Sequence, residues 1–552
     1  MDKNLDFTIV IGGRAGDGIR QTGKLIARTL NQRGYHIFVN EDYPSLIRGG
    51  HNFSIIRCST NPVQAIKENI DILIAMDEKT IQKHKNLNKN SVIIFDSSDE
   101  TKQKGIGIKM KEYVSEKNYK PIMRNTVAYG TLCKILGIDL KLAKKMIEKI
   151  IGRHVKENIE LVEYGYNQTK ESFTKLDIIK KEKTAIITGN EAIALGAVKA
   201  GLENYYAYPM TPATSVLHYL AENQDKFGLE VYQPESELAT VNMAIGSAFA
   251  GKRSMVGTAD GGFALMTEAL SLTGISETPL LFFVSQRAGP ATGVPTYTSQ
   301  GSLLFTVFAG AGDFQKIVVC PGDAEDSFEY TGKVLNLVWK YQIPGIVLAD
   351  KELSENTYEF NLEILKTVKK DEIKLSTEKN YARYKFTDTG ISPLLFPGKK
   401  DAVVRGTSYE HDEHGITTED LRIVQKMQDK RAKKTESLIN ELKKTKTANI
   451  FGDKKSKTAI ICFGSTKGIC KEVGENLKLK VIQPIFIEPF PIWEIEKELK
   501  GIEKIIVVEL NMTGQLSKIL TQNEIKINKK ILKYNSRPFV YEELHKLIKD
   551  VI

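Results

Sequence analysis

Three polar side chains in the middle of the sequence are of types that hold carboxylates or move protons. Thr211 follows the strand-like run 204–208, Glu237 opens an apolar helical pattern, and Arg287 follows the apolar run 279–284. In an open parallel α/β sheet, ligands bind beyond the carboxyl ends of the strands. We therefore expect Thr211, Glu237 and Arg287 to belong to one site.

Each of these side chains has a chemical use and a simpler structural one. Arg287 can hold a carboxylate through two parallel hydrogen bonds, or it is a surface arginine on a loop. The Thr211 hydroxyl can cradle a carboxylate together with N–H groups of a helix start, or it caps that helix. Glu237 can handle one proton of a cofactor ring, or it complements the helix dipole.

Four motifs, taken in order, resemble the alpha subunit of 2-oxoacid:ferredoxin oxidoreductases over 185–350. They are Tyr-Pro-Met-Thr-Pro at 208–212, Glu-Ser-Glu at 235–237, Gly-Gly-Phe-Ala-Leu-Met-Thr-Glu at 261–268, and Gln-Arg-Ala-Gly-Pro-Ala-Thr-Gly at 286–293. The resemblance implies a thiamine diphosphate enzyme that oxidatively decarboxylates a 2-oxo acid with coenzyme A. Its products would be acyl-CoA, CO2 and reduced ferredoxin.

The resemblance also implies roles for single residues. Glu237 would be catalytic and would contact N1′ of the aminopyrimidine, where a held proton favours the reactive tautomer of the ring. Arg287 would pair with the substrate carboxylate, and two threonine hydroxyls would orient the substrate. The implied cofactor contacts are Glu237, Tyr208 and Pro209, and the implied substrate contacts are Thr211, Arg287 and Thr292.

The segment after Thr292 departs from the family pattern. Tyr297, Ser299 and Ser302 stand where the family often carries charged residues, and a basic residue there could hold a distal carboxylate. We predict 2-oxoglutarate or a broad range of 2-oxo acids as substrate. Pyruvate or a branched 2-oxo acid stays the alternative.

Composition sets further bounds. The 552 residues predict about three domains, and 41% hydrophobic with 26% charged residues is ordinary for a globular protein. The net charge of +10 comes largely from lysine tracts without interleaved aromatics, so we expect no nucleic-acid partner. No apolar run approaches the ~20 residues of a membrane span, and the N-terminus lacks signal-peptide order, which predicts a cytoplasmic protein.

Residues 1–182 form a first predicted α/β unit that resembles the gamma subunit of the same enzymes. A strand at 7–11 is followed by a glycine-rich turn at 12–18 and a helix at 19–30, and further strands are expected at 52–57, 71–76 and 91–96. Such a turn can cradle a phosphate or allow tight packing of the crossover. The resemblance implies a loop that binds CoA or a phosphate, formed by Gly12, Gly13, Gly16, Gly18 and Arg48.

Residues 183–352 are predicted to be a parallel-sheet domain that binds the thiamine pyrimidine, and 353–455 a charged linker. The linker contains a solvated turn at 410–415 and a bridging helix at 420–442. Residues 456–552 resemble the C-terminal domain of transketolases. There Asn511 and Gln515 are candidate contacts, although loop structure is the better explanation for them. The fold class is therefore α/β, with three α/β units.

Cofactors and partners follow from the sequence patterns and the resemblance. None of the five cysteines has the spacing of an iron–sulfur or zinc site, and Gly16-Asp-Gly18 with Asn40 only loosely imitates a thiamine Mg²⁺ signature. We expect no metal on this chain. Mg²⁺, the diphosphate end of the cofactor and a [4Fe-4S] cluster would lie on a beta subunit, in a heterodimer or a dimer of heterodimers. The rival functions are a non-catalytic nucleotide-binding or electron-transfer scaffold and a non-oxidative enzyme of transketolase type.

Overall fold

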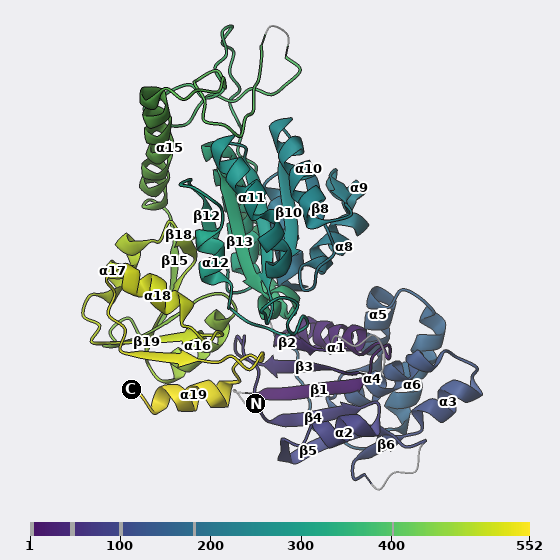
Figure 1. Cartoon of the computed structure of the whole chain (residues 1–552). Coiled ribbons are helices and arrows are strands. Elements are labelled where there is room, and N and C mark those ends of the chain that lie inside the picture. Colours follow the sequence, from purple (N-terminus) through teal and green to yellow (C-terminus); the bar gives the residue numbers. More distant parts are fainter. Residues whose placement is uncertain (1–4, 45–49, 99–102, 180–183, 400–401) are drawn as a thin grey trace. The chain divides into compact units, whose positions relative to one another are not determined.

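The computed structural model describes residues 5–44, 50–98, 103–179, 184–399 and 402–552 (Figure 1). These residues form three β-sheets with helices packed on them, so the predicted α/β class is confirmed. Two compact units result. The first is built mainly from residues before 188, and the second holds most of the remaining chain.

The first unit contains an eight-stranded mixed sheet. β1 pairs antiparallel with β3 and parallel with β4, and β2 pairs antiparallel with β3. The strand order across the sheet is β6 (Ile106–Ile108), β5 (Leu87–Asp96), β4 (Ile70–Ala75), β1 (Asp6–Arg14), β3 (His51–Ser59), β2 (His36–Asp42), β14 (Thr357–Asn361) and β7 (Thr184–Thr188). The sequence did not predict β14, which crosses from the linker to pair antiparallel with β2.

Helices of the first unit pack on this sheet around one apolar core. Ile9, Ile26, Ile56 and Leu132 belong to that core and are essentially inaccessible to solvent. The helices are α1 (Ile19–Gln32), α2 (Glu78–Lys83), α3 (Met110–Glu116), the 3-10 helix η1 (Pro121–Met123), α4 (Arg124–Ile135), α5 (Leu140–Ile150) and α6 (Val155–Gln168).

The second unit contains a seven-stranded sheet that is parallel except at one edge. β10, β11 and β13 are buried along their whole length, which is typical of strands covered by helices on both faces. The strand order is β18 (Phe486–Glu488), β12 (Ile317–Val319), β13 (Pro344–Asp350), β11 (Leu280–Gln286), β10 (Ser254–Ala259), β8 (Asn204–Ala207) and β9 (Glu230–Tyr232). Only β18, at the edge, pairs antiparallel with its neighbour β12.

The helices of this parallel sheet alternate with its strands along the chain, as predicted. α10 and α11 follow β9 and β10 and pack against each other. The full set is α7 (Gly189–Lys199), α8 (Thr214–Glu222), α9 (Gln224–Phe227), α10 (Glu237–Phe249), α11 (Asp260–Ile275), α12 (Leu303–Phe308), α13 (Ala324–Tyr341) and α14 (Lys351–Glu355).

A five-stranded sheet completes the second unit and shares an apolar core with the seven-stranded sheet. Its strands are β15 (Ala448–Gly452), β17 (Lys480–Pro484), β16 (Thr458–Cys462), β19 (Lys504–Glu509) and β20 (Lys529–Leu532), in that order. The helices that follow in this unit are α16 (Thr466–Asn476), α17 (Ile492–Leu499) and α18 (Gln515–Gln522), whereas most of α19 (Tyr541–Lys549) belongs to the first unit.

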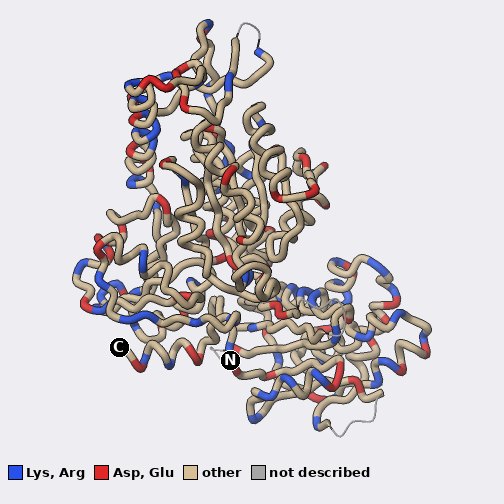
Figure 2. The backbone as a smooth tube through the Cα atoms, in the orientation of Figure 1, with Lys and Arg blue, Asp and Glu red and all other residues tan. Residues whose placement is uncertain are grey.

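The predicted linker holds the 3-10 helix η2 (Leu362–Lys366) and the long helix α15 (Leu421–Leu442), capped by the Asp420 side chain. Basic and acidic residues follow one another along α15 (Figure 2). The turn at 410–415 is not simply solvated, because His411 is fully buried and its ring lies 3.9 Å from that of Tyr384. Its acidic side chains have separate partners. Glu410 accepts a hydrogen bond from Arg431, and Glu413 accepts one from the Phe386 N–H.

Candidate active site

The carboxyl ends of β8, β9, β10 and β11 lie at one edge of the seven-stranded sheet, because these strands are adjacent and parallel. Thr211 follows β8, Glu237 follows β9, and Arg287 follows β11. Helix α11 begins at Asp260, directly after β10. The predicted residues therefore gather around the start of α11.

Glu237 is the first residue of α10 and is only 6% exposed. Its Oε1 lies 2.9 Å from the point where a Cβ on Gly262 would stand, and Thr258 Oγ1 lies 2.2 Å from the same point. Gly262 therefore lets α11 pack closely against Glu237 and Thr258, where any side chain would clash. Among the residues that the structure describes, the buried Thr258 hydroxyl has no hydrogen-bonding partner, and the Glu237 carboxylate forms no hydrogen bond or ion pair.

Arg287 is brought to Thr211 by the turn after β8. Its Nη1 donates to the Thr211 carbonyl at 3.0 Å, and its Nη2 lies 4.0 Å from where a Cβ on Gly261 would stand. The buried Nε has no acceptor among the described residues. Thr211 does not cap α8, whose N-cap is Ala213. The simpler interpretation of Thr211 as a helix cap is therefore wrong, and its carbonyl rather than its hydroxyl meets Arg287.

The other predicted contacts are less closely assembled. Tyr208 is 39% exposed at the end of β8, and Pro209 is half-buried beside it. Thr292 is exposed in the loop closed by the bridge between Ala288 and Val294. The structure does not bring Thr292 against Arg287 or Thr211, so its substrate role stays a prediction.

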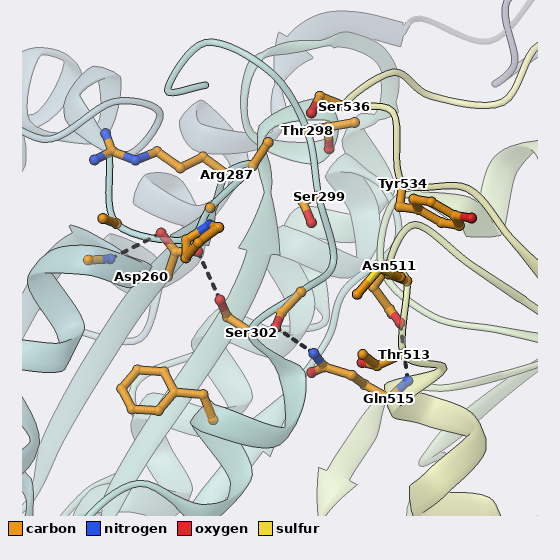
Figure 3. Close-up of a pocket in the computed structure, with 18 of the residues that line it drawn as sticks. Asp260, Arg287, Thr298, Ser299, Ser302, Asn511, Thr513, Gln515, Tyr534 and Ser536 are labelled. Carbon is orange, nitrogen blue, oxygen red and sulfur yellow. Dashed lines mark hydrogen bonds between the residues drawn. The ribbon is translucent and has the colours of Figure 1, made fainter. Parts of the chain in front are cut away.

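A cleft of about 740 Å³ opens beside Arg287 (Figure 3). One wall comes from the start of α11 and the 287–291 loop, and the other from 298–305 and loops of the five-stranded sheet. Figure 3 shows the Arg287 side chain extending away from Asn511 and Gln515 on the far wall.

Asp260 is a functional candidate that the sequence analysis did not single out. Its carboxylate accepts hydrogen bonds from Ser302 Oγ at 2.8 Å and from the Gly261 N–H at 3.0 Å. Burial raises the pKa of Asp260, while the hydrogen bonds from Ser302 and from the Arg287 backbone oppose this shift. The sequence feature that could have indicated Asp260 is its position directly after a buried strand.

Asn511 and Gln515 mainly fix the loops of the cleft. Asn511 donates to the Gln300 carbonyl at 3.1 Å and accepts from the Gly514 N–H at 2.7 Å. Gln515 accepts from the Leu304 N–H at 2.9 Å. Both residues also line the cleft, which agrees with the expectation of loop structure and leaves a ligand contact open.

The predicted phosphate loop differs in one respect from expectation. Gly12 and Gly13 belong to β1, which continues to Arg14, so the turn is confined to the residues before α1. Gly16 and Gly18 have φ of 94° and 72°, the left-handed region that favours glycine. No side chain caps the N-terminus of α1. Arg48 lies outside the described residues.

A small cleft of about 280 Å³ adjoins Gly18, with Lys120, Arg153 and His154 in its lining. Asp17, by contrast, pairs with Arg124 at 2.8 Å, and Asn40 donates to Asn356 at 3.1 Å. The two residues of the imitated Mg²⁺ signature are thus engaged elsewhere. No cluster of three or more histidine, cysteine or acidic residues suited to a metal occurs in the described parts of the chain.

Three family models match the chain in succession. Residues 8–168 match the pyruvate ferredoxin/flavodoxin oxidoreductase model, and 195–430 match its thiamine diphosphate-binding model. Residues 456–542 match core domain II of pyruvate:ferredoxin oxidoreductase. Fold, site and models together define a subunit of a thiamine-dependent 2-oxo acid oxidoreductase.

Individual relatives narrow this class. The 2-oxoacid:ferredoxin oxidoreductase subunit alpha of a Sulfolobus species is 31% identical over 98% of this chain and 96% of its own. The 2-oxoglutarate synthase subunit KorA of Methanocaldococcus jannaschii is 30% identical over 60% of this chain and 90% of its own. The chain belongs to the family of 2-oxoacid:ferredoxin oxidoreductase alpha subunits, as the motifs predicted.

A solved structure extends the match to three dimensions. The 2-oxoglutarate:ferredoxin oxidoreductase of Magnetococcus marinus, determined with 2-oxoglutarate, coenzyme A and succinyl-CoA bound, superposes with a TM-score of 0.89. It is 28% identical, and the match covers 99% of both chains. No helix in the described residues is long and apolar enough to cross a membrane.

Proposed function

We propose that this chain positions the pyrimidine end of thiamine diphosphate at Glu237 and the carboxylate of a 2-oxo acid at Arg287. The complete enzyme would convert the 2-oxo acid and CoA to acyl-CoA and CO2 and pass two electrons to ferredoxin. The observation that carries the proposal is the largely buried Glu237, whose carboxylate forms no hydrogen bond or ion pair with the described residues and packs closely against Gly262.

The residues present fit the cofactor. A buried carboxylate needs a hydrogen-bonding partner, and a protonated ring nitrogen would supply one. The thiamine supplies the carbanion chemistry once it is bound. Glu237 would hold a proton at N1′ of the pyrimidine, and the close packing of Gly262 would keep the carboxylate in place. Tyr208 and Pro209, at the end of β8, would contact the same cofactor.

Arg287 and Thr211 would hold the substrate. The guanidinium is fixed by the Thr211 carbonyl, so its remaining N–H groups are oriented before a substrate arrives. The Nε–H without an acceptor among the described residues favours a negative charge nearby. The hydroxyls of Thr211 and Thr292 would orient the acid, which for Thr292 requires its exposed loop to close on the substrate.

A beta subunit would complete the site. Leu238 and Met243 of α10 and Leu265 of α11 are 45–53% exposed, although large apolar side chains on adjacent helices are usually covered. We infer that the beta subunit packs on this face and brings the diphosphate site, Mg²⁺ and a [4Fe-4S] cluster. A dimer of such heterodimers with ferredoxin as electron acceptor is the expected assembly.

The first unit would hold coenzyme A. The uncapped start of α1 and the nearby Lys120, Arg153 and His154 offer positive potential to a phosphate group. These residues support the predicted loop of Gly16 and Gly18, while Gly12 and Gly13 would act only through the packing of β1.

The test is anaerobic co-purification of this chain with its beta subunit, followed by an assay with thiamine diphosphate, Mg²⁺, CoA and several 2-oxo acids. We expect CoA-dependent reduction of a low-potential dye and the visible absorbance of an iron–sulfur cluster in the complex. A folded complex that reduces no dye with any 2-oxo acid would instead favour the scaffold function.

A further inference from the structure

Asp260 stands where the proposed substrate site meets the cleft. It is the first residue of α11, and Figure 3 shows its carboxylate hydrogen-bonded to Ser302 in the lining of the cleft. The Arg287 side chain extends away from the far wall. A 2-oxo acid held by the guanidinium of Arg287 would therefore have to pass Asp260 to place its side chain in the cleft.

Asp260 is held in place by several parts of the second unit. Ser302 binds one carboxylate oxygen, the Gly261 N–H binds the other, and the Arg287 backbone N–H adds a third hydrogen bond. Hydrogen bonds of this kind favour the ionised carboxylate, which opposes the effect of burial. The cleft entrance thus has a fixed negative charge that a flexible surface side chain would not provide.

The other described residues that line the cleft include no compensating cation. Asp260 and Arg287 are the only charged residues among the described residues that line it. The other polar groups are hydroxyls and amides, and the Thr298 hydroxyl, 2% exposed, lacks a partner among the described residues. A neutral chain of moderate size would fit this lining, whereas a second carboxylate would meet Asp260 without a paired charge.

We propose that Asp260 is a specificity-determining residue that selects 2-oxo acids with an uncharged side chain over 2-oxo dicarboxylic acids. The inference rests on the proposed function, because it takes Arg287 as the group that holds the shared carboxylate. It narrows the predicted range of 2-oxo acids by giving the enzyme a preference for acids such as 2-oxobutyrate over 2-oxoglutarate, which is among the substrates predicted from the sequence. Asp260 acts by repelling the second carboxylate, so discrimination lies in binding more than in turnover.

The experiment compares kcat/KM for 2-oxobutyrate and 2-oxoglutarate in the reconstituted complex with its beta subunit. We expect the wild type to favour 2-oxobutyrate by about tenfold or more, the scale of one unpaired like charge at short range. Asp260→Asn should reduce this preference about tenfold, mainly by lowering the KM for 2-oxoglutarate. Raising the salt concentration should reduce the preference of the wild type for 2-oxobutyrate, because salt screens the charge of Asp260.

Glu268→Gln is the matched control, because it removes an exposed carboxylate of the same helix that does not line the cleft. The preference should then stay within about twofold of the wild type, because solvent and salt screen an exposed charge. Equal or better use of 2-oxoglutarate by the wild type overturns the inference, as does a preference that responds neither to Asp260→Asn nor to salt. If Asp260→Asn does not fold, the inference is tested by the salt dependence of the substrate preference of the wild type. If the complex reduces the dye with neither acid, the proposed function itself is wrong. This outcome differs from a failure of the inference about Asp260, in which the dye is still reduced.

Discussion

Two groups of buried charges in the second unit differ in how completely they are paired. Where α15 meets the start of β11, Glu277 accepts from Lys430 Nζ at 2.5 Å and also binds Lys434, and Arg383 donates to Gln342 at 2.7 Å. Around the start of α11, the buried Nε of Arg287 and hydroxyl of Thr258 have no partner among the described residues, and the Glu237 carboxylate forms no hydrogen bond or ion pair with them.

The difference separates a structural cluster from a binding site. Buried polar groups in folded proteins are almost always hydrogen-bonded, so a group without a partner needs an explanation. The Glu277 cluster is complete and serves to fix α15. The start of α11 is incomplete, and its missing partners are of the kind that a cofactor ring and a carboxylate would supply. Changes at the two places should therefore have opposite consequences.

The largest expected effect is on stability, at Glu277. Glu277→Gln keeps the shape of the side chain but leaves the buried amines of Lys430 and Lys434 facing a neutral amide instead of a carboxylate. Breaking a buried ion pair on one side is destabilising by about 3–5 kcal/mol. We expect this loss in the free energy of unfolding, measured by chemical denaturation.

Glu441→Gln is the matched control for that change. Glu441 pairs with the half-exposed Lys340 at 2.6 Å, and exposed ion pairs contribute about 0–1 kcal/mol. A loss of less than about 1 kcal/mol in Glu277→Gln would contradict the view of this cluster as a structural clamp.

The next effect is on turnover, at Glu237. Glu237→Gln should lower kcat of the reconstituted complex by about 100-fold or more, the range of a lost proton-transfer group. The unfolding free energy should change by about 1 kcal/mol or less, because the carboxylate has only the helix dipole to stabilise it. Steady-state dye reduction and denaturation measure the two quantities.

Two comparison variants sharpen this result. Glu235→Gln changes the exposed neighbouring carboxylate, and its turnover should stay close to that of the wild type. Arg287→Lys keeps the charge but loses the paired geometry, so it should raise KM more than it lowers kcat. Normal turnover in Glu237→Gln would remove Glu237 from the proposed mechanism.

Sequence periodicity predicted the strands and helices that carry the site. β8, β11 and α10 lie close to their expected ranges, because buried strands of a parallel sheet and helices with one apolar face leave clear patterns. The meeting of Thr211 and Arg287 followed from the same rule, since loops after adjacent parallel strands share one edge.

Features that depend on distant partners escaped prediction. β14 is a five-residue strand that forms by pairing with β2, more than 300 residues earlier, and with β7. The lysines of α15 looked like solvated surface, yet Lys430 and Lys434 are buried because Glu277 lies opposite them. Asp260 gave only the general signal of its place after a strand, since its partner Ser302 is distant in sequence.

The smallest expected effect is a pH dependence at Lys434. Burial lowers the pKa of Lys434 to about 7. The negative charge of Glu277 opposes this shift, and the positive charge of Lys430 adds to it. Above that pH the folded chain releases a proton that the unfolded chain keeps up to the ordinary lysine pKa. The unfolded state thus binds more protons in this window, and stability rises with pH. In Lys434→Met this contribution is absent.

The unfolding free energy of the wild type, relative to Lys434→Met, should therefore increase by about 1 kcal/mol per pH unit between about pH 7.5 and 9. Denaturation at several pH values measures this slope. Lys444→Met, an exposed lysine just after the same helix, should keep the slope of the wild type. If the difference in unfolding free energy between the wild type and Lys434→Met does not change with pH, Lys434 stays charged in the folded chain. The cluster would then hold two full positive charges on one carboxylate, and the contrast with the unpaired groups at the start of α11 would be weaker than proposed.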